Sequence, residues 1–219
     1  MPRYLLLFLL LFSALAHAEA DWRLVRDDKD RDIRVFVRDQ QGNPYHSFYA
    51  VTHIRTRLST AVAVLADVPA TPEWVARVSQ VKLLKREADR EAWVYTIYKL
   101  PYPFLQRDAV LHSVLTQDAK TGAVTVDTRT TDTLAPKARL VRLTDLHSTW
   151  TLTPLAEGVL KVEFWGEGNP GGYIPSWLFN YNLPDEPALT FRNLRRMVQR
   201  PKYQQASLAY IREPRTGQL

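Results

Sequence analysis

The chain of 219 residues contains no cysteine. This absence excludes a disulfide framework, a zinc site built on thiolates, an iron–sulfur centre, a cysteine nucleophile and a lipoprotein anchor. The motifs G-x-G-x-x-G, G-x-S-x-G, H-E-x-x-H and the P-loop are also missing, so no familiar nucleotide, serine-hydrolase or metalloprotease site is recognisable. From the residues alone we therefore expect no catalytic residue, no metal ligand and no cofactor.

Histidine is also sparse, with five residues in the chain. The four beyond the N-terminal segment are His46, His53, His112 and His147, and none of them forms an i, i+4 pair. Metal ligands on one helix face would need such a spacing. We therefore interpret these histidines as structural residues, including His112, which lies in a predicted strand.

The overall composition is that of an ordinary globular domain. Hydrophobic residues make up 46% and charged residues 24% of the chain, and the formal net charge is +6. This length suits a single domain of moderate size, and no internal repeat or interdomain linker is visible. A modest positive charge permits contact with an anionic surface but does not by itself indicate nucleic-acid binding, so no nucleic-acid partner is expected.

The first residues have the pattern of an export signal. Arg3 precedes an apolar run over residues 4–16, and Ala16-His17-Ala18 offers small residues at a cleavage site. The run is shorter than the roughly 20 residues that a membrane-spanning helix needs, and a charged residue follows at Asp21. We expect residues 1–18 to be a cleaved signal peptide, and the mature protein to be periplasmic.

Strand patterns dominate the middle of the chain. Alternating apolar residues over 31–38 predict a half-buried strand, and 45–54 reads as its hairpin partner. A helix is predicted over 59–67, capped by Ser59 or Thr60, and a second short helix opens at Thr71. Further strands are predicted over 81–85, 92–100, 107–116, 124–131, 140–153 and 160–166. Short turns between them indicate an antiparallel meander.

Helices close the chain. A short apolar helix is predicted over 175–181, and a longer one ends near residue 199. Pro187, Phe191, Leu194 and Val198 form one apolar stripe on the longer helix, which needs cover from the sheet. We expect a curved antiparallel sheet wrapped around this helix, an α+β helix-grip arrangement with a cavity between the two. Residues 202–219 read as a polar tail.

Two motifs carry a family resemblance. The run KLPYPFLQRD at 99–108 and the run NPGGYIPSWLFN at 169–180 resemble those of the START (StAR-related lipid-transfer) domain, and the closest likeness is to the phosphatidylcholine-transfer branch. The segments at 141–143 and 148–152 fit the same pattern. The resemblance covers residues 22–201. It implies a helix-grip (START/Bet v 1-like) fold, a lipid-sized tunnel and no catalytic machinery, gated by the C-terminal helix and the loop before Arg107.

The resemblance and the residue types together suggest a set of ligand contacts. In the phosphatidylcholine-binding branch an aromatic cage holds the choline group, but two of its positions fall here on Thr96 and Ala109, which cannot make cation–π contacts. Choline recognition is therefore not expected. Strand register is left open, and a slip of one residue would reverse which side chains face the tunnel. The candidate ligand-binding residues are Thr96, Tyr98, Tyr102, Phe104, Ala109, Leu111, Ser113, Arg129, Arg142, Trp150, Trp177, Phe191 and Leu194.

The expected function is binding of a lipid or another hydrophobic small molecule, with transfer between membranes as an extension of it. The apolar tip formed by Tyr102, Phe104 and Leu105 would give peripheral, reversible membrane contact. Two alternatives stay open. One is a helix-grip enzyme of the aromatic cyclase or hydrolase type, which requires an inward acid or base such as His112 or Glu163. The other is a ligand sensor that does not transfer its ligand.

Overall fold

The structure is a computed structural model that describes residues 22–136 and 140–214. The predicted signal peptide, residues 1–18, lies outside the described residues. The strands are β1 Arg23–Asp28, β2 Ile33–Gln40, β3 Asn43–Arg55, β4 Val78–Glu87, β5 Glu91–Tyr98, β6 Arg107–Gln117, β7 Val124–Thr130, β8 Val141–Arg142, β9 Leu146–Pro154 and β10 Val159–Gly168. The helices are α1 Leu58–Ala66, α2 Thr71–Trp74, α3 Ser176–Asn182, α4 Asp185–Met197 and α5 Pro201–Gln204.

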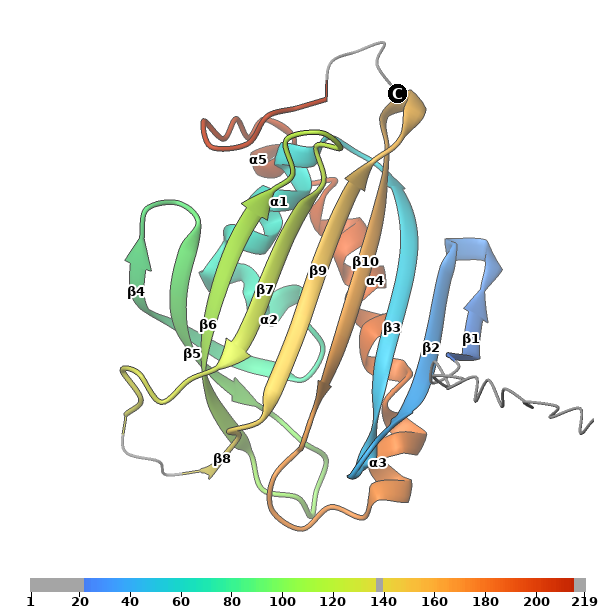
Figure 1. Ribbon diagram of the computed structural model, residues 1–219, viewed down its shortest axis with the longest axis vertical. Helices are drawn as coiled ribbons and strands as arrows, with labels where there is room; N and C mark the ends of the chain where they lie inside the picture. The colour runs from blue at the N-terminus through green and yellow to red at the C-terminus, as the bar shows by residue number, and fades with distance from the viewer. Residues whose placement is uncertain (1–21, 137–139, 215–219) are drawn as a thin grey trace, which may run out of the picture.

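The strands form one sheet in the order β1-β2-β3-β10-β9-β7-β6-β5-β4 (Figure 1). Every pair along this path is antiparallel, as the short turns predicted. The last strand, β10, returns to pair with β3, so the first hairpin and the later meander belong to the same sheet. The two-residue strand β8 lies off the path and pairs in parallel with β6.

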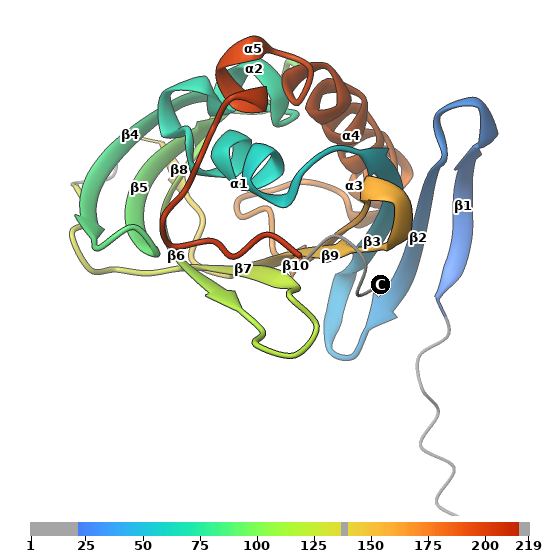
Figure 2. The same cartoon turned by 90° about the horizontal axis from the view of Figure 1, so that it is seen from above.

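The sheet curves around the helices. Seen from above, it forms a trough that holds α1, α2 and α4 (Figure 2). The alternation of β2 explains this one-sided burial, because Ile33, Val35 and Val37 are buried while Arg34 is exposed. The expected α+β helix-grip fold is therefore confirmed.

Helix α4 is held in the trough by its apolar stripe. Pro187, Phe191, Leu194 and Val198 are all buried, as the helical spacing predicted. Phe191 and Leu194 have no exposed surface and belong to the main core, together with apolar residues of β2, β3 and α1. The helix packs over β2 and β3, so this half of the trough is filled by side chains.

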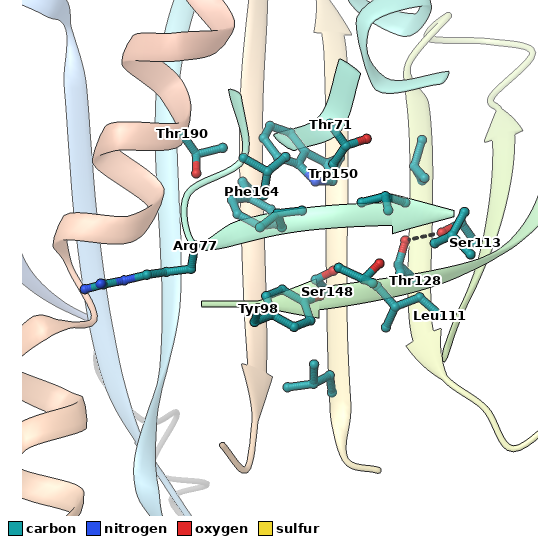
Figure 3. Close-up of a pocket in the computed structure, with 18 of the residues that line it drawn as sticks. Thr71, Arg77, Tyr98, Leu111, Ser113, Thr128, Ser148, Trp150, Phe164 and Thr190 are labelled. Atoms are coloured by element: carbon teal, nitrogen blue, oxygen red, sulfur yellow. Dashed lines mark hydrogen bonds between the residues drawn. The ribbon is translucent and has the colours of Figure 1, made fainter. Parts of the chain in front are cut away.

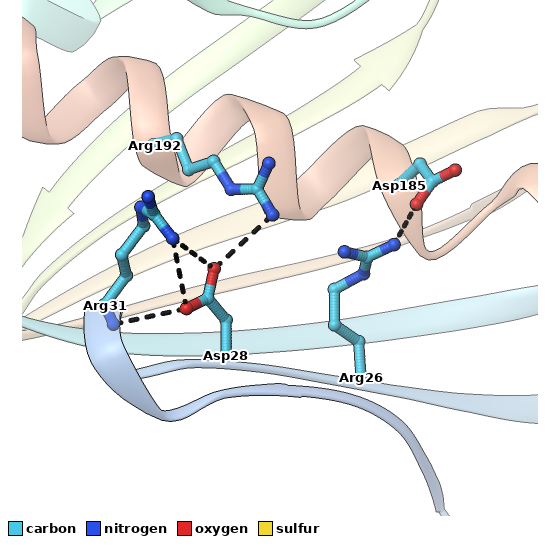
Figure 4. Close-up of polar contacts among 5 residues, drawn as sticks. All are labelled: Arg26, Asp28, Arg31, Asp185 and Arg192. Atoms are coloured by element: carbon cyan, nitrogen blue, oxygen red, sulfur yellow. Dashed lines mark hydrogen bonds and ion pairs between the residues drawn. The ribbon is translucent and has the colours of Figure 1, made fainter.

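Ion pairs fasten α4 to the first strand of the sheet. Arg192 pairs with Asp28 at 3.4 Å, and Asp28 also pairs with Arg31 at 3.3 Å (Figure 4). Arg26 pairs with Asp185 at the start of the helix. These contacts give the arginine-bearing side of α4 partners within the protein.

Helix α1 has a cap that the local sequence does not reveal. The backbone N–H groups of Leu58 and Ser59 donate to the carboxylate of Glu213, at 3.2 and 2.7 Å. The expected cap by Ser59 or Thr60 is wrong, since both lie inside the helix. The described part of the predicted tail, residues 202–214, packs on the domain and buries Tyr203 and Ile211.

Candidate ligand-binding cavity

A cavity of about 380 Å³ lies between the sheet, α2 and the N-terminal part of α4. Its floor is the concave face of the strands from β5 through β10, and its wall is mainly apolar. Helix α4 packs against the other half of the trough, which leaves this half open. Figure 3 shows the lining side chains converging from β4, β5, β6, β7, β9, β10 and α4. The volume lies near the lower end of the range of about 300–1,000 Å³ that is usual for small-molecule sites.

Strand register decides which residues reach the cavity. On β5, Thr96 and Tyr98 lie on its wall, and on β6 Leu111 and Ser113 do so. The pairing of β5 with β6 brings these residues onto one face. Residues between them, such as His112, point to the convex face because successive side chains alternate.

An aromatic cluster forms the end of the cavity nearest α2. The rings of Trp150 and Phe164 are stacked, with centroids 4.1 Å apart, and Trp74 meets Trp150 edge-on at 5.6 Å. All three line the cavity. Phe191 touches Trp150 from the core side at 5.8 Å. The cluster presents a rigid apolar surface to a ligand.

One ion pair connects the edge strand with the helix beside the cavity. Arg77, just before β4, donates through Nε to Oε1 of Glu186 on α4 at 3.1 Å, and both residues line the cavity. Burial raises the pKa of the Glu186 carboxyl, and the Arg77 guanidinium opposes that rise. Burial together with the charge of Glu186 raises the pKa of Tyr98. Figure 3 shows Arg77 reaching from the start of β4 toward α4.

Five of the thirteen candidate residues line the cavity: Thr96, Tyr98, Leu111, Ser113 and Trp150. Arg129 and Arg142 were also expected to reach the ligand, but the strand register turns both side chains away from the cavity. Arg129 lies between the inward residues of β7 and pairs with Asp127 at 3.1 Å. Arg142 pairs with Asp108 at 2.7 Å on the side of β6 that faces away from the cavity.

Three more candidates are packed into the interior without reaching the cavity. Phe191 and Leu194 lie on the side of α4 that faces the core, while Pro187 and Thr190 form its cavity side. Ala109 pairs directly with Thr96 and is fully buried. The last three candidates lie at the end of the molecule, on the β5–β6 loop and on α3, and do not line the cavity: Tyr102, Phe104 and Trp177.

Several lining residues were missed by sequence reasoning. Thr128 and Ser148 follow from the register of β7 and β9, which a sequence without known pairings does not supply. Arg77 and Glu186 lie next to element boundaries, and only the fold brings them together. Thr190 had a local signal, because it precedes a stripe residue of the amphipathic helix by one position.

The loops at one end of the molecule are tied together by Arg107. This buried side chain donates to the carbonyl of Pro170 at 3.2 Å, to that of Gly171 at 3.1 Å and to that of Leu105. The positive φ values of Gly171 and Gly172, 64° and 60°, allow the tight bend that brings the second loop close. Arg107 therefore holds the β5–β6 loop beside the β10–α3 loop.

Histidines form no metal cluster in the part of the chain that the structure describes, where no group of three or more metal-ligating residues occurs. His112 contacts Glu91 at 2.6 Å and stacks on Trp93 with centroids 4.2 Å apart. Glu163 pairs with Lys161 at 2.8 Å and accepts a hydrogen bond from Tyr49. Over the same described residues, no helix is long and apolar enough to cross a membrane.

Comparisons with known proteins agree with this architecture. A crystal structure of a STAR-related lipid transfer protein from Xanthomonas axonopodis superposes with a TM-score of 0.75 and 30% identity, covering 82% of this chain and 99% of that chain. Human StAR-related lipid transfer protein 5 shares the fold, with a TM-score of 0.71 at 15% identity over 83% of this chain and 88% of that chain.

Sequence comparisons point the same way. An uncharacterized protein of Pseudomonas aeruginosa is 34% identical over 176 residues, which are 80% of this chain and 85% of that protein. The family model of the START domain matches residues 9–204. The chain therefore belongs to the START domain family.

Proposed function

We propose that this protein is a periplasmic lipid-binding protein that holds a hydrophobic ligand in the cavity between its sheet and α4. The observation that carries the proposal is the cavity itself, about 380 Å³ in volume and walled by the Trp150–Phe164 stack and aliphatic side chains. Burial of apolar ligand surface supplies affinity at about 25 cal/mol per Å². Membership of the START family and the likeness to a lipid transfer protein from Xanthomonas axonopodis support the same ligand class.

Membrane contact would occur at the end where Arg107 ties the two loops. Five large apolar side chains are exposed on these loops and on α3: Tyr102 at 96%, Leu105 at 69%, Tyr173 at 89%, Trp177 at 70% and Tyr181 at 81%. Tyrosine and tryptophan favour the boundary between lipid headgroups and acyl chains, because one end of the ring is apolar and the other is polar. Reversible insertion of this end would bring the cavity close to its ligand source.

The two acid–base candidates of the enzyme alternative do not line the cavity. His112 and Glu163 point to the convex face and are engaged with Glu91 and Lys161. Glu186 is a cavity carboxyl with a raised pKa, but it is held by Arg77. We propose that the Arg77–Glu186 pair connects β4 with α4 and that the ligand leaves chemically unchanged.

Extraction of the protein from its native compartment tests the proposal. The protein would be expressed from its own signal sequence, purified from the periplasmic fraction without detergent, and extracted with organic solvent for mass spectrometry. The proposal predicts recovery in the periplasm and a lipid-like species at close to one per protein. Repeated preparations that contain no such species would contradict ligand binding, and recovery only from the cytosol would contradict the location.

Movement of the ligand separates a transfer protein from a sensor. Donor vesicles carrying the identified lipid and acceptor vesicles without it would be mixed with catalytic amounts of protein. Transfer of many lipid molecules per protein supports a carrier, whereas a single bound equivalent with no transfer supports the sensor.

A further inference from the structure

Three hydroxyl side chains cross the floor of the cavity in a row. Ser113 on β6 pairs with Thr128 on β7, and Thr128 pairs with Ser148 on β9. All three line the cavity, and the hydroxyls of Ser113 and Thr128 lie 2.8 Å apart within hydrogen-bonding distance. Figure 3 shows the three side chains side by side, with that contact drawn as a dashed line.

The positions at both ends of the row carry small residues, and the Phe48 ring lies over the end at Gly166. Ala92 on β5 pairs with Ser113, and Gly166 on β10 pairs with Ser148. Neither residue has a side chain long enough to cover the hydroxyls. At Gly166, a Cβ atom would lie 2.6 Å from the Phe48 ring, so this position admits no side chain without displacing that ring.

Most of the residues on either side along the strands are apolar. Leu111 and Leu115 flank Ser113 on β6, Leu146 and Trp150 flank Ser148 on β9, and Val126 lies on one side of Thr128 on β7. A hydroxyl in such surroundings is costly unless it forms a hydrogen bond. The row is therefore a polar band across an apolar floor.

Hydrogen-bonding capacity on the row is only partly used. Each hydroxyl has one donor and two acceptor sites. The Ser113–Thr128 contact uses one donor and one acceptor, and Ser148 makes no side-chain hydrogen bond with the residues that the structure describes. Two donors and several acceptors on the band are thus available to a molecule in the cavity.

We propose that Ser113, Thr128 and Ser148 bind an uncharged polar group, such as a hydroxyl, ester or amide, in the body of the ligand. This inference rests on the proposed function, because it assumes that a lipid occupies the cavity. The band carries no formal charge, so an ionised group placed there would lose its hydration without gaining a counter-charge. Most of the charged residues that line the cavity are engaged within the protein: Arg77 pairs with Glu186 at 3.1 Å, Glu91 contacts His112, and Arg86, Arg90 and Arg107 donate to backbone carbonyls. The ligand class is therefore a neutral lipid with hydrogen-bonding capacity away from its ends.

Displacement of Nile red by three matched probes tests the band. The probes are tetradecane, 7-tetradecanol and tetradecanoic acid, and the proteins are the wild type and the double variant Thr128→Val/Ser148→Ala. For the wild type, the alcohol should displace the dye at a concentration about tenfold below that of the alkane, as two net hydrogen bonds would give. In the double variant this advantage should fall to about twofold or less, with the alcohol compared against tetradecane on the same protein.

The matched control is Thr125→Val/Thr151→Val, a directly paired couple on the convex face of β7 and β9. It should keep the advantage of the alcohol. Retention of that advantage in the Thr128→Val/Ser148→Ala variant, or tighter binding of the acid than of the alcohol by the wild type, would overturn the inference. Failure of the wild type to bind Nile red or any probe would instead overturn the proposed function.

Discussion

Arg142 and Asp108 form a two-point ion pair that fastens the two-residue strand β8 to β6. The Nε atom of Arg142 lies 2.7 Å from Oδ1 of Asp108, and its Nη2 atom lies 2.9 Å from Oδ2. The hydroxyl of Tyr95 also donates to Oδ2, at 2.8 Å. Asp108 has no exposed surface, so all of its hydrogen-bonding partners must come from the protein.

Replacing Asp108 with asparagine should destabilise the fold. The Asp108→Asn variant keeps the side-chain shape but leaves the mostly buried Arg142 guanidinium without a counter-charge, which costs about 3 kcal/mol of unfolding free energy. Urea unfolding followed by circular dichroism measures the change. Arg129→Gln is a matched control, because its pair with Asp127 is exposed and should contribute less than about 1 kcal/mol. A loss at Asp108 no larger than in the control would contradict the role of the pair.

The same pair predicts a pH dependence of stability. The Arg142 guanidinium and the Tyr95 hydroxyl hold the pKa of Asp108 below its usual value. A carboxyl with a lowered pKa in the folded state stabilises the fold above its unfolded pKa of about 3.9, and this contribution is lost as the pH falls through the folded value. The stability difference between wild type and Asp108→Asn should therefore be constant from pH 7 to about pH 5 and shrink below about pH 4. A difference that grows as the pH falls below that point would contradict this assignment.

The exposed aromatic end should govern binding to vesicles. Replacing Tyr102 and Trp177 with serine removes two interfacial rings and should weaken binding to phospholipid vesicles by about tenfold or more, with little change in stability. Co-sedimentation measures the binding. The control variant Leu24→Ser/Leu83→Ser removes exposed apolar side chains of β1 and β4 and should bind as the wild type does. Equal losses in both variants would show that this end has no special role.

The cap from the C-terminal segment should contribute to stability. Glu213→Ala removes the acceptor for the N–H groups of Leu58 and Ser59 and should cost about 1 kcal/mol, the usual value of a helix cap. Chemical unfolding measures the loss, and Glu213→Gln should recover part of it through its amide oxygen. Unchanged stability in Glu213→Ala would mean that the segment contributes nothing to α1.

Much of the fold follows from local patterns. The alternation in β2 and the stripe on α4 predict both the elements and their buried faces, because each depends on residues close in the sequence. The cap of α1 does not follow from such patterns. Glu213 lies 154 residues from Ser59, and a carboxylate at that distance leaves no local signal.

The candidate site was harder to predict than the fold, since it depends on pairing between strands. Thr128 lines the cavity and its neighbour Arg129 does not, yet either assignment fits the same sequence until the register of β7 is known. Phe191 and Leu194 were placed on the cavity because an apolar helix face can serve a core or a ligand equally well. The position of α4 over β2 and β3 decides in favour of the core.

Filling the cavity tests the central claim most directly. Leu111→Trp adds bulk on the cavity side of β6, and Thr116→Trp adds the same ring on the convex side of the same strand. Native mass spectrometry of each folded protein, purified without detergent, would report the fraction that carries lipid. The account predicts close to one lipid per protein in the wild type and in Thr116→Trp, and at least a tenfold lower fraction in Leu111→Trp. Equal lipid loading of all three proteins would contradict it.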